Sequence, residues 1–307
     1  MKIYKLFLLC LIIAGTSCKS IIEDKKEKRE NIASSVKIEV QGHRGERGYF
    51  PENSLPGFIS SVNKGADVLE LDVVISKDKK VVVSHEPFMS SLYMLTSEGD
   101  SIPKESEQSY NFYNMTYDSI KQFDAGSKGN PLFPNQKKMS TYKPLLSEVI
   151  DSVENHVQAH NLEPVRYNIE LKSIPSLYGI YQPQPEEFVT LVMQVIQEKG
   201  IEDKMNLQSF DPVILNVLRK KYPEIKVAYL VSGEGIQKNL ALLDFKPEIY
   251  SPQYSFIKNQ QFVDSIKILD MKLIPWTVNE KEAILEMIRM KVDGIITDYP
   301  DRVLEEL

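Results

Sequence analysis

Acidic residues spaced two apart lie inside short apolar runs that are typical of buried strands. Glu70 and Asp72 share one run, and Glu170 lies in another beside Lys172. Side chains two residues apart in a strand point to the same face, so Glu70 and Asp72 project together, as do Asn168, Glu170 and Lys172. The spacing therefore predicts two groups of polar side chains on the inner face of a sheet.

Carboxylates that project from different strands into one interior need a partner, because desolvating each costs several kcal/mol. One divalent cation held by Glu70, Asp72 and Glu170 would supply it. A ligand set of oxygen atoms favours Mg²⁺ or Ca²⁺ over Zn²⁺. An internal ion-pair network with Arg44 and Lys172 is the alternative that the residues leave open.

Two of the four histidines, His43 and His85, close predicted strands. An imidazole has a pKa near neutrality, so such a pair can take and give protons during displacement at phosphorus. His156 and His160 are spaced four apart on a predicted helix over 145–160. They lack the glutamate of a zinc-protease motif, and we expect them on the solvated surface.

The elements that must position these residues follow an alternating pattern. Nine apolar runs predict strands over 36–40, 68–75, 81–85, 166–171, 205–210, 227–231, 248–251, 273–278 and 292–297. Eight helical patterns accompany them, and the connection between 68–75 and 81–85 is too short for a helix. The pattern predicts an α/β fold, a (β/α)8 TIM barrel with a β-hairpin in an early βα unit.

Three helix starts carry their own signals. Ser54 can cap a helix that begins at Leu55, and Asp211 precedes a first-turn proline. Asn279 with Glu282 three residues later resembles a capping box for a helix that runs through Met290.

Residues 87–143 interrupt the alternation and contain five tyrosines. A long insertion with its own aromatic content favours an inserted subdomain or lid. A surface excursion without a role is the alternative.

The first residues are typical of an export signal. Lys2 and Lys5 precede an apolar run over 6–14 and small residues over 15–17, while a bilayer-spanning helix needs about 20 apolar residues. Residues 15–18 resemble a lipobox, although position 15 is Gly rather than Leu. We expect a signal peptide over 1–17, a lipidated Cys18 and a mixed-charge tether over 18–35. The mature chain would be an exported, membrane-anchored lipoprotein on the periplasmic side or cell surface, with plain secretion as the alternative.

Composition limits the remaining possibilities. The chain has 307 residues, a formal net charge of −6 and a sequence pI near 5.5, which argues against a nucleic-acid partner. Its two cysteines, Cys10 and Cys18, cannot build a disulfide framework or a thiolate metal site in the domain over 36–307. At this length a single barrel with extensions is a natural size.

Eight motifs in order resemble the glycerophosphodiester phosphodiesterases over about residues 40–307. They are His-Arg-Gly with Pro-Glu-Asn-Ser at 43–54, Glu-Leu-Asp-Val at 70–73, Val-Val-Ser-His at 82–85, Phe-Asp-Ala-Gly at 123–126, Asn-Ile-Glu-Leu-Lys at 168–172, Gln-Ser-Phe-Asp at 208–211, Trp-Thr-Val-Asn at 276–279 and Asp-Gly-Ile-Ile-Thr-Asp at 293–298. Glu86 stands where many members have Asp, and Ser54 replaces the usual Thr. The resemblance implies a metal-dependent phosphodiesterase on an eight-stranded barrel.

The resemblance also implies residue roles. His43 and His85 match the general acid and base, and the carboxylates of the predicted cation site match the metal ligands. Arg44 and Lys172 match the cations that contact phosphate, with Glu52 nearby. Trp276 matches a residue of the substrate wall, or else it is a packed barrel aromatic.

The implied reaction is hydrolysis of a small-molecule glycerophosphodiester to glycerol 3-phosphate and an alcohol. A phospholipase D-like or phosphoinositide-type phosphodiesterase that acts on lipid is the first alternative. A non-catalytic, surface-binding lipoprotein on the same scaffold is the second.

Overall fold

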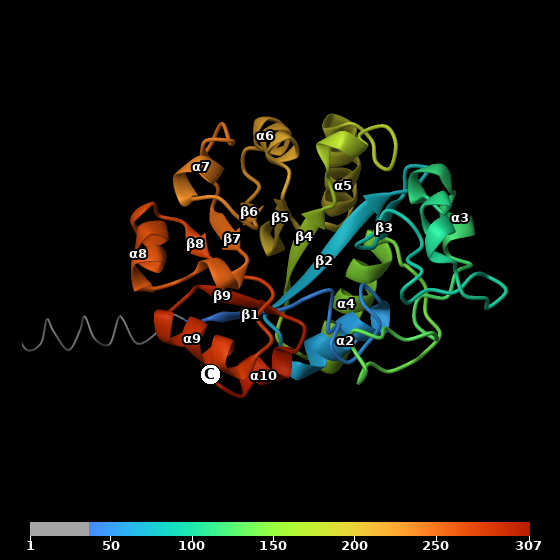
Figure 1. Ribbon diagram of the computed structural model, residues 1–307, viewed down its shortest axis with the longest axis horizontal. Helices are drawn as coiled ribbons and strands as arrows, with labels where there is room; N and C mark the ends of the chain where they lie inside the picture. The colour runs from blue at the N-terminus through green and yellow to red at the C-terminus, as the bar shows by residue number, and fades with distance from the viewer. Residues whose placement is uncertain (1–36) are drawn as a thin grey trace, which may run out of the picture. The chain divides into compact units, whose positions relative to one another are not determined.

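The computed structural model describes residues 37–307 (Figure 1). The predicted signal peptide, tether and lipidated Cys18 lie outside the described residues. Within residues 37–307, none of the helices combines the length and the apolar content that crossing a bilayer requires.

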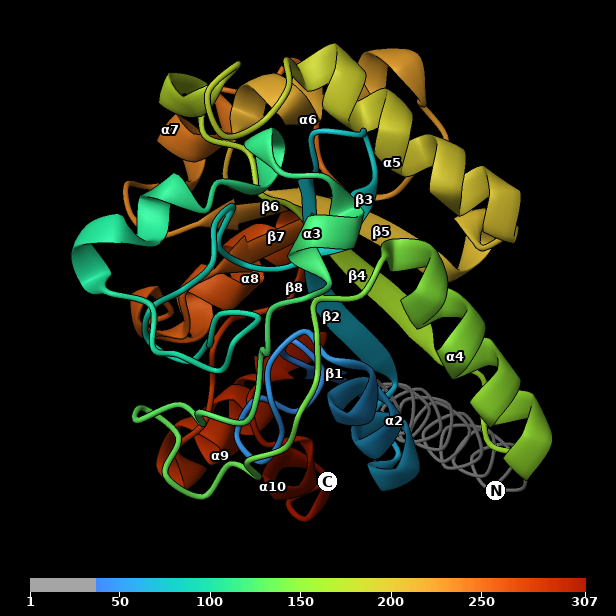
Figure 2. The ribbon, with the colours of Figure 1, turned by 90° about the vertical axis from the view of Figure 1, so that its right-hand side faces the viewer.

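Eight parallel strands form a barrel-like sheet at the centre of the domain (Figure 2). They are β1 (Glu39–Gly42), β2 (Val68–Ile75), β4 (Arg166–Leu171), β5 (Met205–Ser209), β6 (Val227–Val231), β7 (Ile249–Pro252), β8 (Lys272–Leu273) and β9 (Gly294–Thr297). Their order is β8-β7-β6-β5-β4-β2-β1-β9, and β3 (Val81–Val83) pairs antiparallel with β2. The predicted TIM barrel with an early hairpin is confirmed.

The gap between β8 and β9 is bridged by backbone hydrogen bonds. The sequence predicts a strand over 273–278, but the regular strand ends at Leu273, two residues before Pro275, which has no N–H to give to a ladder. The segment still bonds on both sides: Ile274 N donates to Tyr250 O, and Ile296 N donates to Pro275 O at 3.0 Å. These bonds nearly close the barrel.

Helices surround the strands (Figure 1). They are α2 (Leu55–Lys64), α4 (Leu146–His160), α5 (Pro185–Lys199), α6 (Pro212–Lys221), α7 (Ile236–Leu240), α8 (Gln260–Ile268), α9 (Lys281–Met290) and α10 (Pro300–Leu304). Their apolar faces and the outward strand side chains, such as Leu69, Leu71 and Ile169, build the main core. The predicted alternation of inward and outward residues on β2 and β4 follows from this packing.

Two of the three predicted helix starts match the structure, and one is wrong. Ser54 accepts a hydrogen bond from Gly57 N, and Asp211 accepts one from Val213 N. Helix α9 instead begins at Lys281 after Glu280, without a side-chain cap. The Asn279 side chain is used elsewhere, because its Nδ2 donates to Asp298 at 2.7 Å.

The inner face of the barrel has a polar side and an apolar side. Amide side chains form a ladder near the amino ends of the strands, where Asn168 Nδ2 donates to Gln41 Oε1 and Asn206 Nδ2 donates to Asn168 Oδ1. On the opposite side the buried residues are apolar, namely Ala228, Ile249, Ile274 and Ile296. A ligand in this barrel therefore meets polar groups on β1, β2, β4 and β5 and an apolar wall on β6 to β9.

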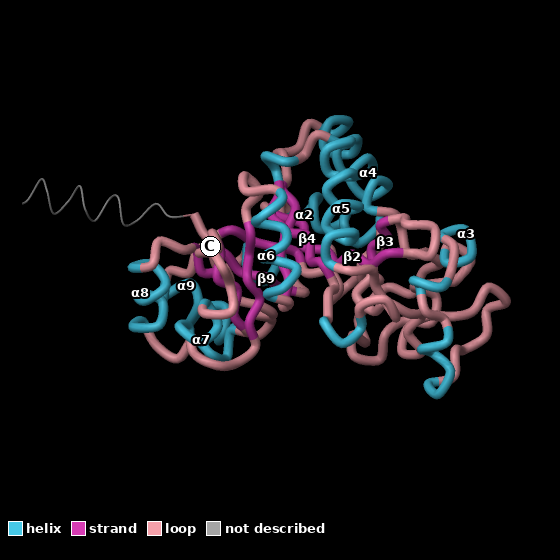
Figure 3. The backbone as a smooth tube through the Cα atoms, turned by 90° about the horizontal axis from the view of Figure 1, so that it is seen from above, coloured by secondary structure: helices cyan, strands magenta, loops and turns pink. Residues whose placement is uncertain are grey.

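Residues 87–143 lie beside the hairpin, mainly as loops (Figure 3). They contain α3 (Tyr117–Ile120) and the 3-10 turns η1 (Lys104–Ser109) and η2 (Phe112–Asn114). Buried apolar side chains, among them Met89, Met94 and Phe112, form a second core with Val74 and Val82 of the hairpin. The insertion is thus packed onto β2 and β3.

The insertion also holds the loop that follows β1. Gln136 Nε2 donates to Arg47 O, and Lys137 N donates to Tyr49 O, both at 2.8 Å. At Gly126 an added Cβ would lie 2.7 Å from Pro51 Cγ, so only glycine fits this close approach.

Candidate active site

A pocket of about 330 Å³ opens among the carboxyl ends of the strands, where active sites of (β/α)8 barrels lie. Its lining includes seven residues that the sequence singles out, namely His43, Arg44, Glu70, His85, Glu170, Lys172 and Trp276. Glu52 and Asp72 are buried behind this lining and contact Arg44. The structure therefore brings all nine predicted site residues together.

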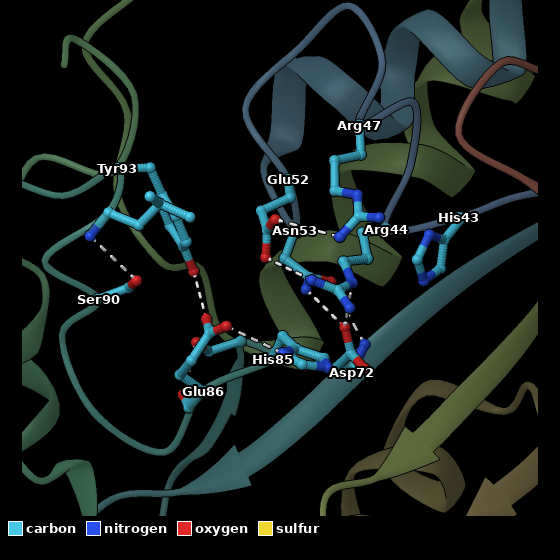
Figure 4. Close-up of polar contacts among 12 residues, drawn as sticks. His43, Arg44, Arg47, Glu52, Asn53, Asp72, His85, Glu86, Ser90 and Tyr93 are labelled. Atoms are coloured by element: carbon cyan, nitrogen blue, oxygen red, sulfur yellow. Dashed lines mark hydrogen bonds and ion pairs between the residues drawn. The ribbon is translucent and has the colours of Figure 1, made fainter. Parts of the chain in front are cut away.

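The loop after β1 is shaped by left-handed backbone conformations. Arg44 and Asn53 have φ angles of 51° and 53°, and Gly45 has a φ of 86°. This turn lets the Arg44 N–H donate to Glu70 at 2.9 Å while its guanidinium donates to Glu52 at 2.9 Å and lies 3.3 Å from Asp72. Asn53 Nδ2 also donates to Asp72 (Figure 4). The loop thus positions two of the predicted cation ligands.

The three predicted cation ligands converge. Glu70, Asp72 and Glu170 each offer a carboxylate oxygen, and these oxygens lie within 4.8 Å of one another. Burial and the neighbouring carboxylates raise the pKa of Glu70, and burial raises that of Glu170. Burial opposes the charge of Asp72 too, but Arg44 holds the pKa of Asp72 well below its usual range. Asp72 Oδ1 is buried and accepts no hydrogen bond from the described part of the chain.

The internal ion pairs that were the alternative are also present, but they do not balance the charge. Lys172 Nζ lies 2.7 Å from Glu170 and 3.7 Å from Asp72, and Arg44 divides its charge between Asp72 and Glu52. Among residues 37–307, the donors at hydrogen-bond distance from Glu70 are neutral, namely Arg44 N–H and Gln208 Nε2. With all three carboxylates ionised, Arg44 and Lys172 leave negative charge in the cluster uncompensated, and its oxygen donors fit one hard divalent cation.

His43 is oriented by a carboxylate from the far end of the chain. Its Nδ1 lies 2.6 Å from Asp298 Oδ1, and its Nε2 lies 3.9 Å from Glu70. Arg47 and Asn279 donate to the same Asp298 carboxylate. Burial lowers the pKa of His43 to about 4, although Asp298 opposes this shift. The imidazole is therefore neutral at pH 7.

His85 has an equivalent partner next to it in the sequence. Its Nδ1 lies 3.0 Å from Glu86 Oε1, and the other Glu86 oxygen accepts a 2.6 Å hydrogen bond from Tyr93 (Figure 4). Burial opposes the charge of Glu86, yet the contact with His85 holds the pKa of Glu86 below its usual range. Because a carboxylate only accepts, this pairing calls for a proton on His85 Nδ1 and leaves Nε2 free.

The apolar wall contains an aromatic pair. Phe210 and Trp276 meet edge to face with ring centroids 5.3 Å apart, and both line the pocket. Trp276 Nε1 donates to Ser251 O at 2.9 Å. Trp276 therefore lines the pocket and is also packed inside the barrel, so the two alternatives for this residue do not exclude each other.

Several residues belong to the site although the sequence predicts no part in it for them. They are Arg47, Asn53, Gln208, Asn279 and Asp298, together with Glu86 and Tyr93. Asp298 and Asn279 stand inside two of the eight motifs, but the contact of Asp298 with His43 and the hydrogen bond from Asn279 to Asp298 appear only in three dimensions. On α4, His160 is exposed and His156 is partly exposed, and both lie outside the pocket, as expected.

Comparisons with known proteins agree with this geometry. Residues 43–302 match the model of the glycerophosphoryl diester phosphodiesterase family. A glycerophosphodiester phosphodiesterase of Caldanaerobacter subterraneus is 31% identical over 272 residues, covering 88% of this chain and 97% of the relative. One from Bacillus altitudinis is 30% identical and covers 87% and 96%.

A solved structure supports the same conclusion. An Oleispira antarctica phosphodiesterase, determined in complex with its product sn-glycerol-3-phosphate, has a TM-score of 0.68 and 25% identity, covering 87% of this chain and 95% of that one. The barrel, the converging polar residues and the family match over most of the domain agree. The chain is an enzyme that belongs to the glycerophosphodiester phosphodiesterase family.

Proposed function

We propose that this enzyme hydrolyses glycerophosphodiesters to glycerol 3-phosphate and an alcohol by acid–base catalysis with His43 and His85 beside one divalent cation. The observation that carries the proposal is the shared pocket. Two histidines line it, each bonded through Nδ1 to its own carboxylate, and so do two members of the three-carboxylate cluster, with Asp72 buried behind them. The family membership and the product complex of the Oleispira antarctica relative support this substrate class.

Glu70, Asp72 and Glu170 would hold the cation, with Ca²⁺ or Mg²⁺ as the candidates that suit their oxygens. When bound, such an ion supplies Lewis-acid stabilisation of charge on the phosphoryl group. Arg44 and Lys172 line the same pocket and would offset the charge that builds on the phosphoryl oxygens. Glu52 would act through Arg44, because its carboxylate accepts from the guanidinium.

The proton transfers follow from the free Nε2 atoms. One histidine takes the proton of the glycerol 2-hydroxyl, whose oxygen forms a bond to phosphorus. The bond from phosphorus to the leaving alcohol breaks, and the other histidine gives that alcohol its proton. Water then opens the resulting cyclic phosphate, with the proton transfers reversed, to give glycerol 3-phosphate.

Alanine variants of the two histidines test this proposal. His43→Ala and His85→Ala should each lower kcat for glycerophosphocholine by about 10²- to 10⁴-fold, because each removes a proton-transfer group. His160→Ala, at an exposed histidine at the end of α4, serves as the matched control and should keep wild-type kcat. Wild-type turnover in both site variants would refute the assignment.

A lipid substrate remains the second candidate, and the apolar wall favours it. Phe210, Leu230, Trp276 and Ile296 line the side of the pocket opposite the charged residues. An alcohol group that carries an acyl chain could lie on this wall. Choline release from glycerophosphocholine and from lysophosphatidylcholine separates the two: a higher kcat/KM for the lipid would favour the phospholipase D-like alternative. The non-catalytic alternative is wrong, because the chain belongs to an enzyme family.

We also propose, from the sequence alone, that Cys18 is lipidated after export. Cys18→Ser should move the protein from the membrane fraction to the soluble exported fraction and abolish incorporation of labelled fatty acid. Cys10→Ser, inside the predicted signal peptide, is the control and should leave both unchanged. Membrane association that survives Cys18→Ser would contradict the anchor.

A further inference from the structure

The carboxylate that orients His85 is not fixed by its own position in the chain. Glu86 directly follows His85 and its side chain is 25% exposed. A glutamate side chain has three rotatable bonds and can turn toward water unless something holds it. In this structure the second oxygen of Glu86 is held by Tyr93 of the insertion (Figure 4).

Tyr93 is well suited to hold that carboxylate. It is 4% exposed and belongs to the apolar core of the insertion with Met89 and Met94. Its hydroxyl donates to Glu86 Oε2 at 2.6 Å, so the hydroxyl oxygen is left to accept. Lys143 Nζ donates a hydrogen bond to this Tyr93 oxygen at 3.3 Å.

Lys143 is completely buried, which is rare for a lysine. Its Nζ also lies 4.9 Å from the centroid of the Tyr93 ring. The next residue is tied to the hairpin, because Val83 N donates to Pro144 O at 2.8 Å. Lys143 therefore stands beside β3, the strand that leads into His85, and an apolar residue would satisfy the packing there at lower cost.

A continuous chain of contacts thus runs from Lys143 through Tyr93 and Glu86 to His85. It ends at a side chain with no exposure to water, so it suits orientation rather than passage of protons to solvent. The arrangement parallels the one at His43, where Arg47 and Asn279 fix the Asp298 carboxylate.

We propose that Tyr93 and Lys143 are positioning residues for His85, and that the insertion serves the reaction by locking Glu86 against the imidazole. This inference rests on the proposed function of His85. Tyr93 and Lys143 touch neither substrate nor cation in this proposal, and they act through Glu86.

The test compares two buried tyrosines of the insertion that each donate to a glutamate. Tyr93→Phe removes the hydrogen bond to Glu86, whereas Tyr117→Phe removes a 2.7 Å bond to Glu148 far from His85 in the chain. We expect Tyr93→Phe to lower kcat by about 10- to 100-fold with KM within about twofold, as is typical for loss of an outer-shell partner. Tyr117→Phe should leave kcat unchanged. Equal kcat in Tyr93→Phe and wild type would overturn the proposal.

A spectroscopic readout separates this proposal from the role of His85. Imidazole ¹⁵N spectra of the full chain, with His85 assigned by the signal missing in His85→Ala, should show the Nδ1–H form in wild type. Tyr93→Phe should shift His85 toward the Nε2–H form, and Tyr117→Phe should not. If His85→Ala stays fully active, the proposed function fails while this shift still reports positioning. An unchanged spectrum in Tyr93→Phe would overturn the positioning role itself.

Lys143 is tested by additivity. Lys143→Met should lower kcat to a similar degree, and the double variant with Tyr93→Phe should lose little more, because both act through one contact chain. If the fall in kcat of the double variant equals the product of the two single falls, Lys143 does not act through Tyr93. A lower melting temperature with full kcat in Lys143→Met would make Lys143 a packing residue only. Either result would refute its part of the proposal. If Lys143→Met does not fold, Lys143→Arg takes its place: the larger planar head cannot reproduce the Tyr93 contact, and unchanged kcat would count against the proposal.

Discussion

Each histidine of the pocket presents one nitrogen to a carboxylate and one to the cavity. His43 bonds Asp298, and His85 bonds Glu86. A carboxylate partner selects the Nδ1–H form and stabilises the imidazolium that forms during proton transfer. In the proposed reaction the two carboxylates would therefore matter as much as the imidazoles that they orient.

Asp298→Asn tests the role of the carboxylate that bonds His43, because it replaces one carboxylate oxygen with an amide nitrogen. The amide keeps the size of the side chain but removes the negative charge beside His43, so kcat should fall by about 10²- to 10⁴-fold with a smaller change in KM. Asp301→Asn is the control, because Asp301 pairs with Lys64 on α2 and lies outside the pocket. Steady-state kinetics on glycerophosphocholine measure both, and an Asp298→Asn kcat within twofold of wild type would contradict the role.

The sequence singled out the residues that the structure brings into the pocket, but not the residues that orient them. Glu70 and Asp72 could be paired because a strand fixes their common direction. Asp298 is 255 residues from His43, and no local pattern relates the two. Asn279 was misread as a helix cap because the signal for a cap is local, whereas its actual partner, Asp298, lies on a different strand end.

At the scale of elements, the junction between the insertion and α4 is held by one glutamate. Glu148 accepts from Leu145 N–H at the start of the helix, from Tyr117 OH and from Lys121. Burial opposes its charge, but these donors lower the pKa of Glu148 below its usual value. A single carboxylate therefore joins the helix start to α3.

Glu148→Gln should reveal this as a pH-dependent loss of stability. A carboxyl group with a lowered pKa in the folded state stabilises above its unfolded pKa of about 4.3, and that stabilisation is lost as the pH falls through the folded value. The variant should be about 1–2 kcal/mol less stable than wild type at pH 7, and the difference should shrink below about pH 4. Urea unfolding from pH 7 to pH 3 measures this.

Glu286→Gln, an exposed glutamate on α9, is the matched control. It should show a small difference from wild type at every pH. A Glu148→Gln deficit that stays constant down to pH 3 would contradict the ionic contribution.

The regular elements were predictable because their periodicity is set by burial on one face. Strands β2 and β4 match their predicted ranges, since apolar outward residues alternate there with inward polar ones. Strand β8 was predicted too long, because Pro275 breaks the ladder while neighbouring bonds persist. The sequence showed where the insertion begins and ends, but it did not predict the structure of the insertion. The short turns there depend on packing against the hairpin and have no hydrophobic periodicity of their own.

At the scale of the whole molecule, the enzyme is acidic yet is proposed to bind an anion. The net charge is −6, so long-range attraction cannot draw the substrate in. The proposed binding would depend instead on the local cations Arg44 and Lys172 and on an ion at the carboxylate cluster. The three converging carboxylates make that ion central to the proposed reaction.

The most direct test is metal removal and restoration on the full chain. Treatment with EDTA should abolish release of glycerol 3-phosphate from glycerophosphocholine, and Ca²⁺ or Mg²⁺ in excess should restore it. Binding of that ion should also raise the melting temperature of the chelated protein, because it stabilises only the folded state. Glu170→Gln should weaken both effects. Full hydrolysis by the chelated enzyme, with no response to either ion, would contradict the account.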